Sequence, residues 1–383
     1  MDDDVRFYRP SCMMLDVTEY CPSECGHCGY ECGPYGNSLD KKTITKLMKD
    51  AAEEGIQILA ISGGEPFSSR NLYHAVREAK KNSIKLYSIM TSGFFGKNRS
   101  SARRVLERLK DAGYSTDKVK VRKLFGKTDK VGTHFQLSID KFHEEFVPHR
   151  YVFNVIDAYY DTFGTTDGLA IDFSFLKDDA EDLNKMVKSL PISRKDDGGY
   201  VYNSRRGDIE FILSPIVYAG RARNIEKSSF MTWPVRKVLK DIRKKKLPCI
   251  GPFSAHNMVT IRGDGSAYPC CSLFYKEIPR LKIGSVNEDS LHKITEHANK
   301  DPLLNFMMVK NTTMLFGRIG KTMLDAYDNY LDNAVTHECE ICKDMLSDEK
   351  VLAVLESKAR KKLPKLRKLQ KKIYPEIYPD AKP

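Results

Sequence analysis

The stretch Cys21-Pro22-Ser23-Glu24-Cys25-Gly26-His27-Cys28 places three thiols on one short segment, at spacing C-x3-C-x2-C. An apolar run at 13–17 precedes it and predicts a strand. Three thiolates can hold most of an iron–sulfur cube but cannot complete it, because such a cube takes four ligands. A structural zinc site would also need a fourth ligand, and it usually shows two C-x2-C pairs. The stretch therefore predicts a metal cluster with one open corner.

The remaining cysteines are grouped and not spread along the chain. The ten cysteines lie within 12–32, 249–271 and 339–342, and none occurs between 33 and 248. A disulfide framework would be distributed more evenly, so this grouping indicates metal ligands in a reducing compartment. The N-terminal segment 1–4 is acidic and lacks the layout of a signal peptide, and no apolar run approaches the roughly 18–20 residues of a membrane helix. We therefore expect a cytoplasmic protein with two clusters and no membrane span.

Charge is concentrated at the C-terminal end. The 383 residues carry a net charge of +12, and the segment 357–372 has nine basic side chains and no acidic one. This segment is either a solvated tail or a docking surface for an acidic partner. We do not expect nucleic acid as a partner, since neither aromatic interleaving nor a known binding motif accompanies the basic residues.

Short apolar runs alternate with helical patterns, which predicts βα units around a parallel sheet. A helix is expected to open at 38–45 and to carry Leu47, Met48, Ala51 and Ala52 on one side. Further helices are expected near 70–81, 100–113, 149–163 and 178–190. Segment 115–132 is basic and predicts an insertion or hairpin, while 195–206 is polar and glycine-rich. The six expected strands lie at 13–18, 56–61, 84–90, 133–139, 169–175 and 209–217.

The character of the sequence changes after residue 222. A β-hairpin is expected from Met258 to Tyr268 around a glycine turn, with helices at 289–298, 302–310, 320–334 and 348–363. Four prolines from Pro364 onward predict an irregular C-terminal end. The sequence thus predicts a core domain at 1–225, an extension at 226–346, and a basic helix and tail at 347–383.

The motifs with chemical potential each follow an expected strand. They are the cysteine stretch, the Gly63-Gly64-Glu65-Pro66 turn, the Thr91-Ser92-Gly93 turn and Asp140. In open α/β folds, ligands bind at the carboxyl ends of the strands. The recurrence of special residues at four such ends predicts one shared site.

The cysteine stretch, together with Gly63-Gly64-Glu65-Pro66, resembles the radical S-adenosylmethionine (SAM) enzymes. The resemblance implies a partial (βα)6 barrel in which Cys21, Cys25 and Cys28 hold a 4Fe–4S cluster and the open iron binds SAM. The family places an aromatic residue before the third cysteine, and His27 departs from that pattern. Glycines permit close backbone approach, and a carboxylate accepts from an ammonium group, which fits contact with the methionine amino group. The residues that the resemblance assigns to SAM are Gly63, Gly64, Glu65, Ser92 and, more loosely, Asp140.

A second resemblance, to the SPASM/twitch extension of these enzymes, lies in the C-terminal cysteines. Cys249, Gly265 and Cys270 match its start at spacing C-x15-G-x4-C, and Cys339-x2-Cys342 supplies a second pair. The resemblance implies an auxiliary 4Fe–4S cluster held by Cys249, Cys270, Cys339 and Cys342. No cysteine follows Cys342, so the shorter twitch form, with one auxiliary cluster, matches better. Four protein ligands imply a saturated cluster with an electron-transfer or structural role.

These resemblances imply an enzyme that cleaves SAM reductively to a 5′-deoxyadenosyl radical, which abstracts a hydrogen atom from an unactivated carbon. Relatives with this extension modify ribosomally made peptides by epimerisation, crosslinking or oxidation, and we expect such a peptide here. The alternatives are a sugar or other small-molecule dehydrogenase or epimerase, and a non-catalytic iron–sulfur electron carrier. An external electron donor of the flavodoxin or ferredoxin type is also implied.

Several single residues allow more than one interpretation. Cys271 is either a packing residue, or a substitute ligand for Cys270, or the hydrogen-atom donor of an epimerisation. Cys12 is expected to be a buried structural thiol, and Cys32 would close the first cluster only if the protein were an electron carrier. His143 either forms a local hydrogen bond or faces the substrate. Arg221, in a Gly-Arg-Ala segment like one in the extended enzymes, could pair with a carboxylate.

Overall fold

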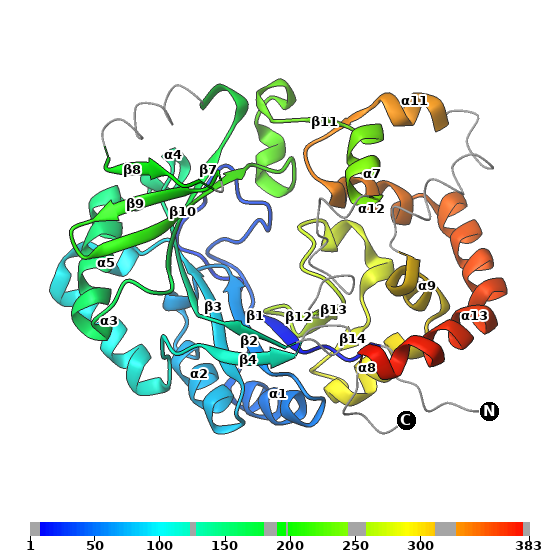
Figure 1. Cartoon of the computed structure of the whole chain (residues 1–383), viewed down its shortest axis with the longest axis horizontal. Helices are drawn as coiled ribbons and strands as arrows, with labels where there is room; N and C mark the ends of the chain where they lie inside the picture. The colour runs from blue at the N-terminus through cyan, green and yellow to red at the C-terminus, as the bar shows by residue number, and fades with distance from the viewer. Residues whose placement is uncertain are drawn as a thin grey trace.

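The computed structural model describes residues 8–122, 128–179, 190–196, 198–243, 258–310 and 327–377. Six parallel strands, joined in chain order, form the centre of one large sheet, as Figure 1 shows. This confirms the predicted α/β barrel-type fold. The strands are β1 (Cys12–Thr18), β2 (Ile58–Gly63), β3 (Lys85–Thr91), β6 (His134–Ser138), β7 (Leu169–Phe175) and β10 (Gly207–Pro215).

Helices cover the outer face of these strands (Figure 1). They are α1 (Lys41–Glu53), α2 (Leu72–Lys81), α3 (Arg99–Ala112) and α5 (His149–Phe163), with a short α4 (Lys141–Glu144) before the last. Their apolar faces join the main core, where Met13, Leu15 and Val17 of β1 are fully buried. Since side chains alternate along a strand, Cys12, Met14 and Asp16 point to the opposite, inner face. The inner face is therefore left for the site.

The sheet continues past β10 in a way that the sequence analysis did not anticipate. Strands β9 (Tyr200–Ser204) and β8 (Ile192–Arg194) add to it antiparallel. Strand β9 lies within the polar, glycine-rich segment 195–206, and β8 lies just before that segment. The run Tyr200-Val201-Tyr202 does favour a strand, but its glycine-rich surroundings hid the signal. The expected hairpin at 115–132 is confirmed as β4 (Val119–Arg122) and β5 (Thr128–Val131). Most of the helix expected at 178–190 lies outside the described residues.

The extension contains the expected hairpin, β12 (Met258–Ile261) and β13 (Ser266–Tyr268), which is followed by β14 (Gly284–Ser285). Strand β12 pairs in parallel with β1, so that the barrel sheet runs on into the extension. Arg262, fully buried at the end of β12, donates from Nη1 to Asp16 Oδ2 on β1 at 2.8 Å. Its guanidinium also lies 4.5 Å and 4.0 Å from the ring centres of Tyr30 and Tyr275. A buried cation thus ties the extension to the barrel.

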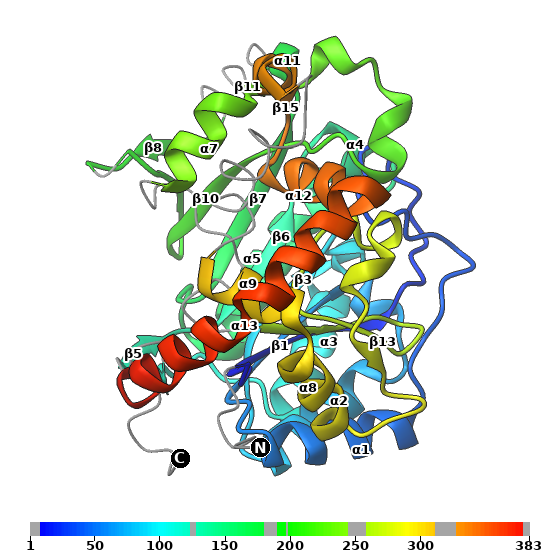
Figure 2. The ribbon, with the colours of Figure 1, turned by 90° about the vertical axis from the view of Figure 1, so that its right-hand side faces the viewer.

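Helices make up the rest of the extension, and Figure 2 shows the last one crossing the face above α8 and α9. Helix α13 continues through Pro364 and Pro375, so the expectation of an irregular end is wrong for residues 364–377, while 378–383 lie outside the described residues. A proline removes one amide donor, and here the flanking turns remain helical. No described helix has the length and hydropathy that crossing a membrane requires. The elements are α7 (Val235–Arg243), α8 (Leu291–Lys300), α9 (Pro302–Lys310), α11 (Tyr327–Asp332), α12 (Glu338–Ser347) and α13 (Glu349–Ile377), with β11 (Trp233–Pro234) paired to β15 (Ala334–Val335).

Candidate active site

The cysteine stretch lies on a loop that leaves β1 and is closed at its base by backbone hydrogen bonds. The amide of Glu19 donates to the Asn37 carbonyl at 2.7 Å, and the amide of Cys21 donates to the Gly33 carbonyl at 2.9 Å. The amide of Cys28 donates to the Cys25 carbonyl at 3.1 Å. These contacts fix the loop's shape through the backbone, so the thiols are free to face a ligand.

The glycine turn after β2 is packed against the start of this loop. The amide of Gly64 donates to the Thr18 carbonyl at 2.8 Å, and the amide of Glu65 donates to the Tyr20 carbonyl at 2.9 Å. A Cβ on Gly64 would lie 2.2 Å from the Tyr20 carbonyl oxygen, closer than any real contact allows. Close approach of two backbones therefore requires glycine here, independently of any ligand.

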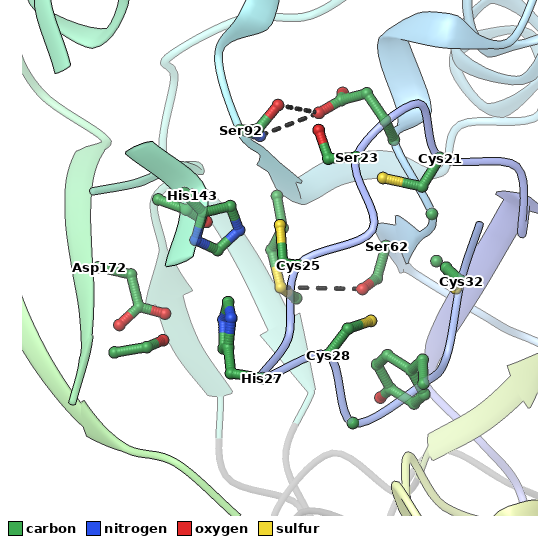
Figure 3. Close-up of a pocket in the computed structure, with 18 of the residues that line it drawn as sticks. Cys21, Ser23, Cys25, His27, Cys28, Cys32, Ser62, Ser92, His143 and Asp172 are labelled. Carbon is green, nitrogen blue, oxygen red and sulfur yellow. Dashed lines mark hydrogen bonds between the residues drawn. The ribbon is translucent and has the colours of Figure 1, made fainter. Parts of the chain in front are cut away.

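Glu65 joins the ends of β2 and β3. Its Oε1 accepts from the Thr91 hydroxyl at 2.8 Å and from the Phe67 amide at 3.1 Å. Its Oε2 accepts from the amide and the hydroxyl of Ser92 at 2.9 and 2.7 Å (Figure 3). Burial raises the pKa of this carboxyl despite the four hydrogen bonds. The carboxylate is held rigidly, as a residue that orients a cationic ligand must be.

These elements surround a cavity of about 350 Å³. Of the predicted site residues, Cys21, Cys25, Cys28, Gly63, Gly64, Glu65 and Ser92 line it. Figure 3 shows the three cysteines on one side of the cavity, with His143 and Asp172 on the other. Leu273, from the extension, also contributes to the lining. The structure thus brings together residues from three strand ends and from the C-terminal half of the chain.

Asp140 is placed behind this lining and not in it. Its Oδ1 caps α4 by accepting from the amides of Phe142 and His143, both at 3.0 Å. Its Oδ2 lies 2.7 Å from Nδ1 of His143, which does line the cavity. Burial lowers the pKa of His143, but the hydrogen bond and charge of Asp140 outweigh it and the net pKa is raised. Asp140 therefore orients His143, while its predicted contact with SAM ribose stays a prediction.

His27 occupies the position where the family has an aromatic residue. Its ring centre lies 4.8 Å from those of Phe142 and His143. Burial lowers its pKa to about 4, so the ring is neutral at pH 7. The imidazole thus packs between the cysteine loop and α4, at the position where the family has an aromatic side chain.

A polar wall that the sequence analysis missed completes the cavity. Asp172 on β7 accepts from Gln136 Nε2 on β6 and from the Ser214 hydroxyl on β10, both at 2.6 Å. Ser138 and Ser174 extend the wall toward the strand ends. A signal was available: polar residues recur at every second position in otherwise apolar strands, which marks a polar inner face.

The three loop thiols fit an iron–sulfur cluster. All are free, and the cavity that they line offers space for a ligand beside them. Burial raises the pKa of Cys21 to about 11 and of Cys25 to about 12, so positive charge must compensate the thiolates that a cluster needs. Nη2 of Arg221, which also lines the cavity, is buried without a partner among the described residues. Such an unpaired donor fits an anionic group in the cavity.

The C-terminal cysteines lie apart from this cavity. Cys339 and Cys342 share a face of α12, because residues three apart on a helix are neighbours. Cys270 follows β13, and all three thiols are half-buried and free of disulfides. Cys249, the fourth predicted ligand, lies outside the described residues. That Cys270, Cys339 and Cys342 hold a second cluster together with Cys249 therefore stays a prediction.

Cys271 is absent from the described residues that line the cavity. Its side chain packs on the inner-face cluster of Cys12, Met14, Ile58 and Met258, together with Met90, which does line the cavity. Its carbonyl accepts from the Tyr30 hydroxyl at 3.1 Å. The thiol therefore shares an apolar cluster with a cavity-lining residue but is not itself among the described residues of the lining.

Two family models match the chain in the regions that hold the cysteines. Residues 15–122 match the radical SAM superfamily, and residues 249–314 match an iron–sulfur cluster-binding domain, SPASM. The first match contains the cysteine loop, the glycine turn and Ser92 in one cavity. The chain contains a radical SAM domain. Together with the SPASM domain, it implies 4Fe–4S clusters and SAM as the cofactors.

Curated relatives resemble only part of this radical SAM chain. It is 27% identical over 122 residues to a probable GTP 3′,8-cyclase of Methanosarcina mazei, which is 30% of this chain and 36% of that protein. It is 33% identical over 87 residues to a PqqA peptide cyclase of Gluconobacter oxydans, or 22% of this chain and 24% of that protein. The chain thus matches about a third or less of the length of these relatives.

A solved structure has the same fold along almost the whole chain. It is described as native anSMEcpe with bound AdoMet and Cp18Cys peptide, and it superposes with a TM-score of 0.50 at 12% identity. The superposition covers 94% of this chain and 99% of that one. At this identity the likeness concerns the fold alone. It supports a radical SAM barrel followed by an extension.

Proposed function

We propose that this radical SAM enzyme holds its catalytic cluster on Cys21, Cys25 and Cys28 and modifies a ribosomally made peptide. The observation that carries the proposal is the cavity of about 350 Å³, which Cys21, Cys25 and Cys28 line together with a polar wall. Cys32, a fourth free cysteine, lines it as well. Fold-related anSMEcpe is described with AdoMet and a peptide bound, and a relative acts as a PqqA peptide cyclase. Both support a peptide over a sugar. The electron donor is proposed to be an external flavodoxin or ferredoxin type.

When bound, the reduced cluster and SAM supply a carbon radical that abstracts a hydrogen atom from the substrate. The chain's own contribution is placement. Backbone carbonyls of Gly63 and Gly64, with the immobilised Glu65 carboxylate, are proposed to hold the methionine ammonium, and Ser92 to contact the ribose. Because these groups are already fixed in position, bound SAM and substrate do not have to be oriented at an entropic cost when the reaction occurs.

The polar wall is proposed to orient the substrate. Asp172 and Gln136 are already hydrogen-bonded to each other, so their positions do not depend on the substrate. His143, held by Asp140, presents its second ring nitrogen from the same side. Leu273 of the extension closes part of the cavity with an apolar side chain and helps to exclude water.

We propose an oxidative outcome, either crosslinking or dehydrogenation, in preference to epimerisation. An epimerisation needs a hydrogen-atom donor at the substrate, and Cys271 is not among the described residues that line the cavity. The auxiliary cluster, proposed on Cys249, Cys270, Cys339 and Cys342, would accept the electron that oxidation releases. The core at 1–225 and extension at 226–346 are thus proposed to divide the work.

The test is anaerobic reconstitution of the full chain followed by iron counting and a dithionite assay for 5′-deoxyadenosine. We expect about eight irons per chain, as two cubes require, and SAM-dependent formation of 5′-deoxyadenosine. Four irons would contradict the auxiliary cluster. Eight irons without SAM cleavage, with candidate peptides present, would contradict the enzyme and favour an electron carrier.

A further inference from the structure

Arg221 is the one lysine or arginine among the described residues that line the cavity. It lies in a short 3-10 helix, η5 (Gly220–Asn224), that follows β10. Its side chain lines the cavity together with all three loop cysteines, Cys21, Cys25 and Cys28. A permanent cation therefore lies beside the proposed cluster ligands.

The cysteine loop itself fixes the position of Arg221. Its backbone amide donates to the Cys28 carbonyl at 3.1 Å, and its Nε donates to the Cys25 carbonyl at 3.0 Å. Gly220, at φ +54°, allows this approach, because a Cβ there would lie 2.6 Å from the Cys28 carbonyl oxygen. Arg221 is thus held to two of the three ligand-bearing residues, by its guanidinium to Cys25 and by its backbone amide to Cys28.

One nitrogen of this clamped guanidinium has no partner. Nη2 is buried and makes no hydrogen bond to the described residues. A buried, charged donor left unpaired is costly, so its environment must supply an acceptor in the working protein. In a cavity beside three thiolate ligands, the cluster's sulfur atoms are acceptors that would be present whether or not SAM is bound.

We propose that Arg221 tunes the radical SAM cluster by donating from Nη2 to a cluster sulfur and by placing positive charge beside it. This rests on the proposed function of Cys21, Cys25 and Cys28. Reduction moves one electron from the external donor to the cluster and makes it more negative. A neighbouring cation and N–H donor stabilise that form, so Arg221 raises the reduction potential. Arg221 is a positioning and tuning residue and does not itself react.

The chain offers a matched control two residues away. Arg223 lies on the same 3-10 helix, but both oxygens of Glu277 accept from its Nη2 at 2.7 Å. Its side chain is 37% exposed and does not line the cavity. Removal of this charge changes the net charge of the protein equally without touching the cysteine loop.

The test is an EPR-monitored redox titration of the reconstituted full chain without SAM, for wild type, R221Q, R221K and R223Q. A separate sample with SAM identifies the radical SAM cluster by the signal that SAM changes. We expect the potential of that cluster to shift negative in R221Q, less in R221K, and not in R223Q. Omission of SAM from the titration removes any effect of Arg221 on a SAM carboxylate.

An unchanged potential in both R221Q and R221K, with the cluster present, overturns the inference while the proposed function stands. If R221Q does not hold the cluster, R221K decides: a potential equal to wild type overturns the inference, and a more negative one supports it. An equal shift in R223Q also overturns it, since a general charge effect would then suffice. A wild type without a SAM-responsive cluster contradicts the proposed function instead.

Discussion

The two cysteine regions of this radical SAM protein differ in what surrounds their thiols. Cys21, Cys25 and Cys28 are held by backbone contacts on a loop that faces a cavity with a polar wall. Cys339 and Cys342 lie on α12, and neither they nor Cys270 belong to the described lining of that cavity. An open cluster therefore requires more than the absence of a fourth thiolate. It also requires space for its ligand and side chains that contact that ligand.

The largest expected effect separates the two regions directly. C28A should reduce 5′-deoxyadenosine formation to below about a thousandth of wild type, because the cluster that cleaves SAM loses a ligand. C342A should lose the second cluster's iron but keep SAM cleavage. Iron counting and the dithionite assay measure both. Comparable loss of cleavage in the two variants would mean that the regions do not have separate roles.

A second variant tests the buried Arg262–Asp16 ion pair that joins the extension to the barrel. R262M leaves Asp16 as an uncompensated buried charge and should lower the free energy of unfolding by about 3–5 kcal/mol in urea titrations. The control is R236M, because the Arg236–Asp332 pair is exposed and should contribute about 0–1 kcal/mol. Equal losses in the two variants would show that the buried tie contributes no more than a surface pair.

A third variant tests the packing of the glycine turn on the cysteine loop. G64A places a Cβ against the Tyr20 carbonyl and should cost about 1–3 kcal/mol and weaken SAM binding. G26A, within the loop itself, meets only Phe142 at 3.9 Å and should leave both unchanged. Thermal unfolding and equilibrium dialysis with SAM measure the pair. If G64A behaves like G26A, the close contact has no role.

The smallest expected effect concerns Cys271. Since its thiol is not among the described residues that line the cavity, C271A should keep substrate turnover within about twofold of wild type. In deuterated water, the wild-type product should carry no solvent deuterium at the reacting carbon. Deuterium that appears in the wild-type product and vanishes in C271A would instead establish the thiol as a donor and epimerisation as the outcome.

Local patterns predicted much of the fold. The bounds of α5 and β7 match the expected 149–163 and 169–175 because apolar periodicity and a terminal glycine define them locally. The pairing of β12 with β1 was not predictable in this way, since it joins residues far apart in the chain. Helix α13 ran beyond Pro364 because the propensity of one residue is a weak guide within a long helix.

The residues of the site show the same difference between features set by local sequence and features set by tertiary contacts. Gly63, Gly64, Glu65 and Ser92 were predictable because they directly follow strands. The roles of Asp140 and Arg221 depend on tertiary contacts with His143 and with the Cys25 and Cys28 carbonyls. Sequence alone identified these two residues but not what they touch.

The most direct test of the contrast between an open and a closed cluster is EPR of the reduced, reconstituted full chain with and without SAM. We predict that SAM changes the EPR signal of one cluster only. C28A should abolish this SAM-responsive signal, and C342A should retain it. A responsive signal that survives C28A and disappears in C342A would contradict this prediction, because the open cluster would then lie in the extension.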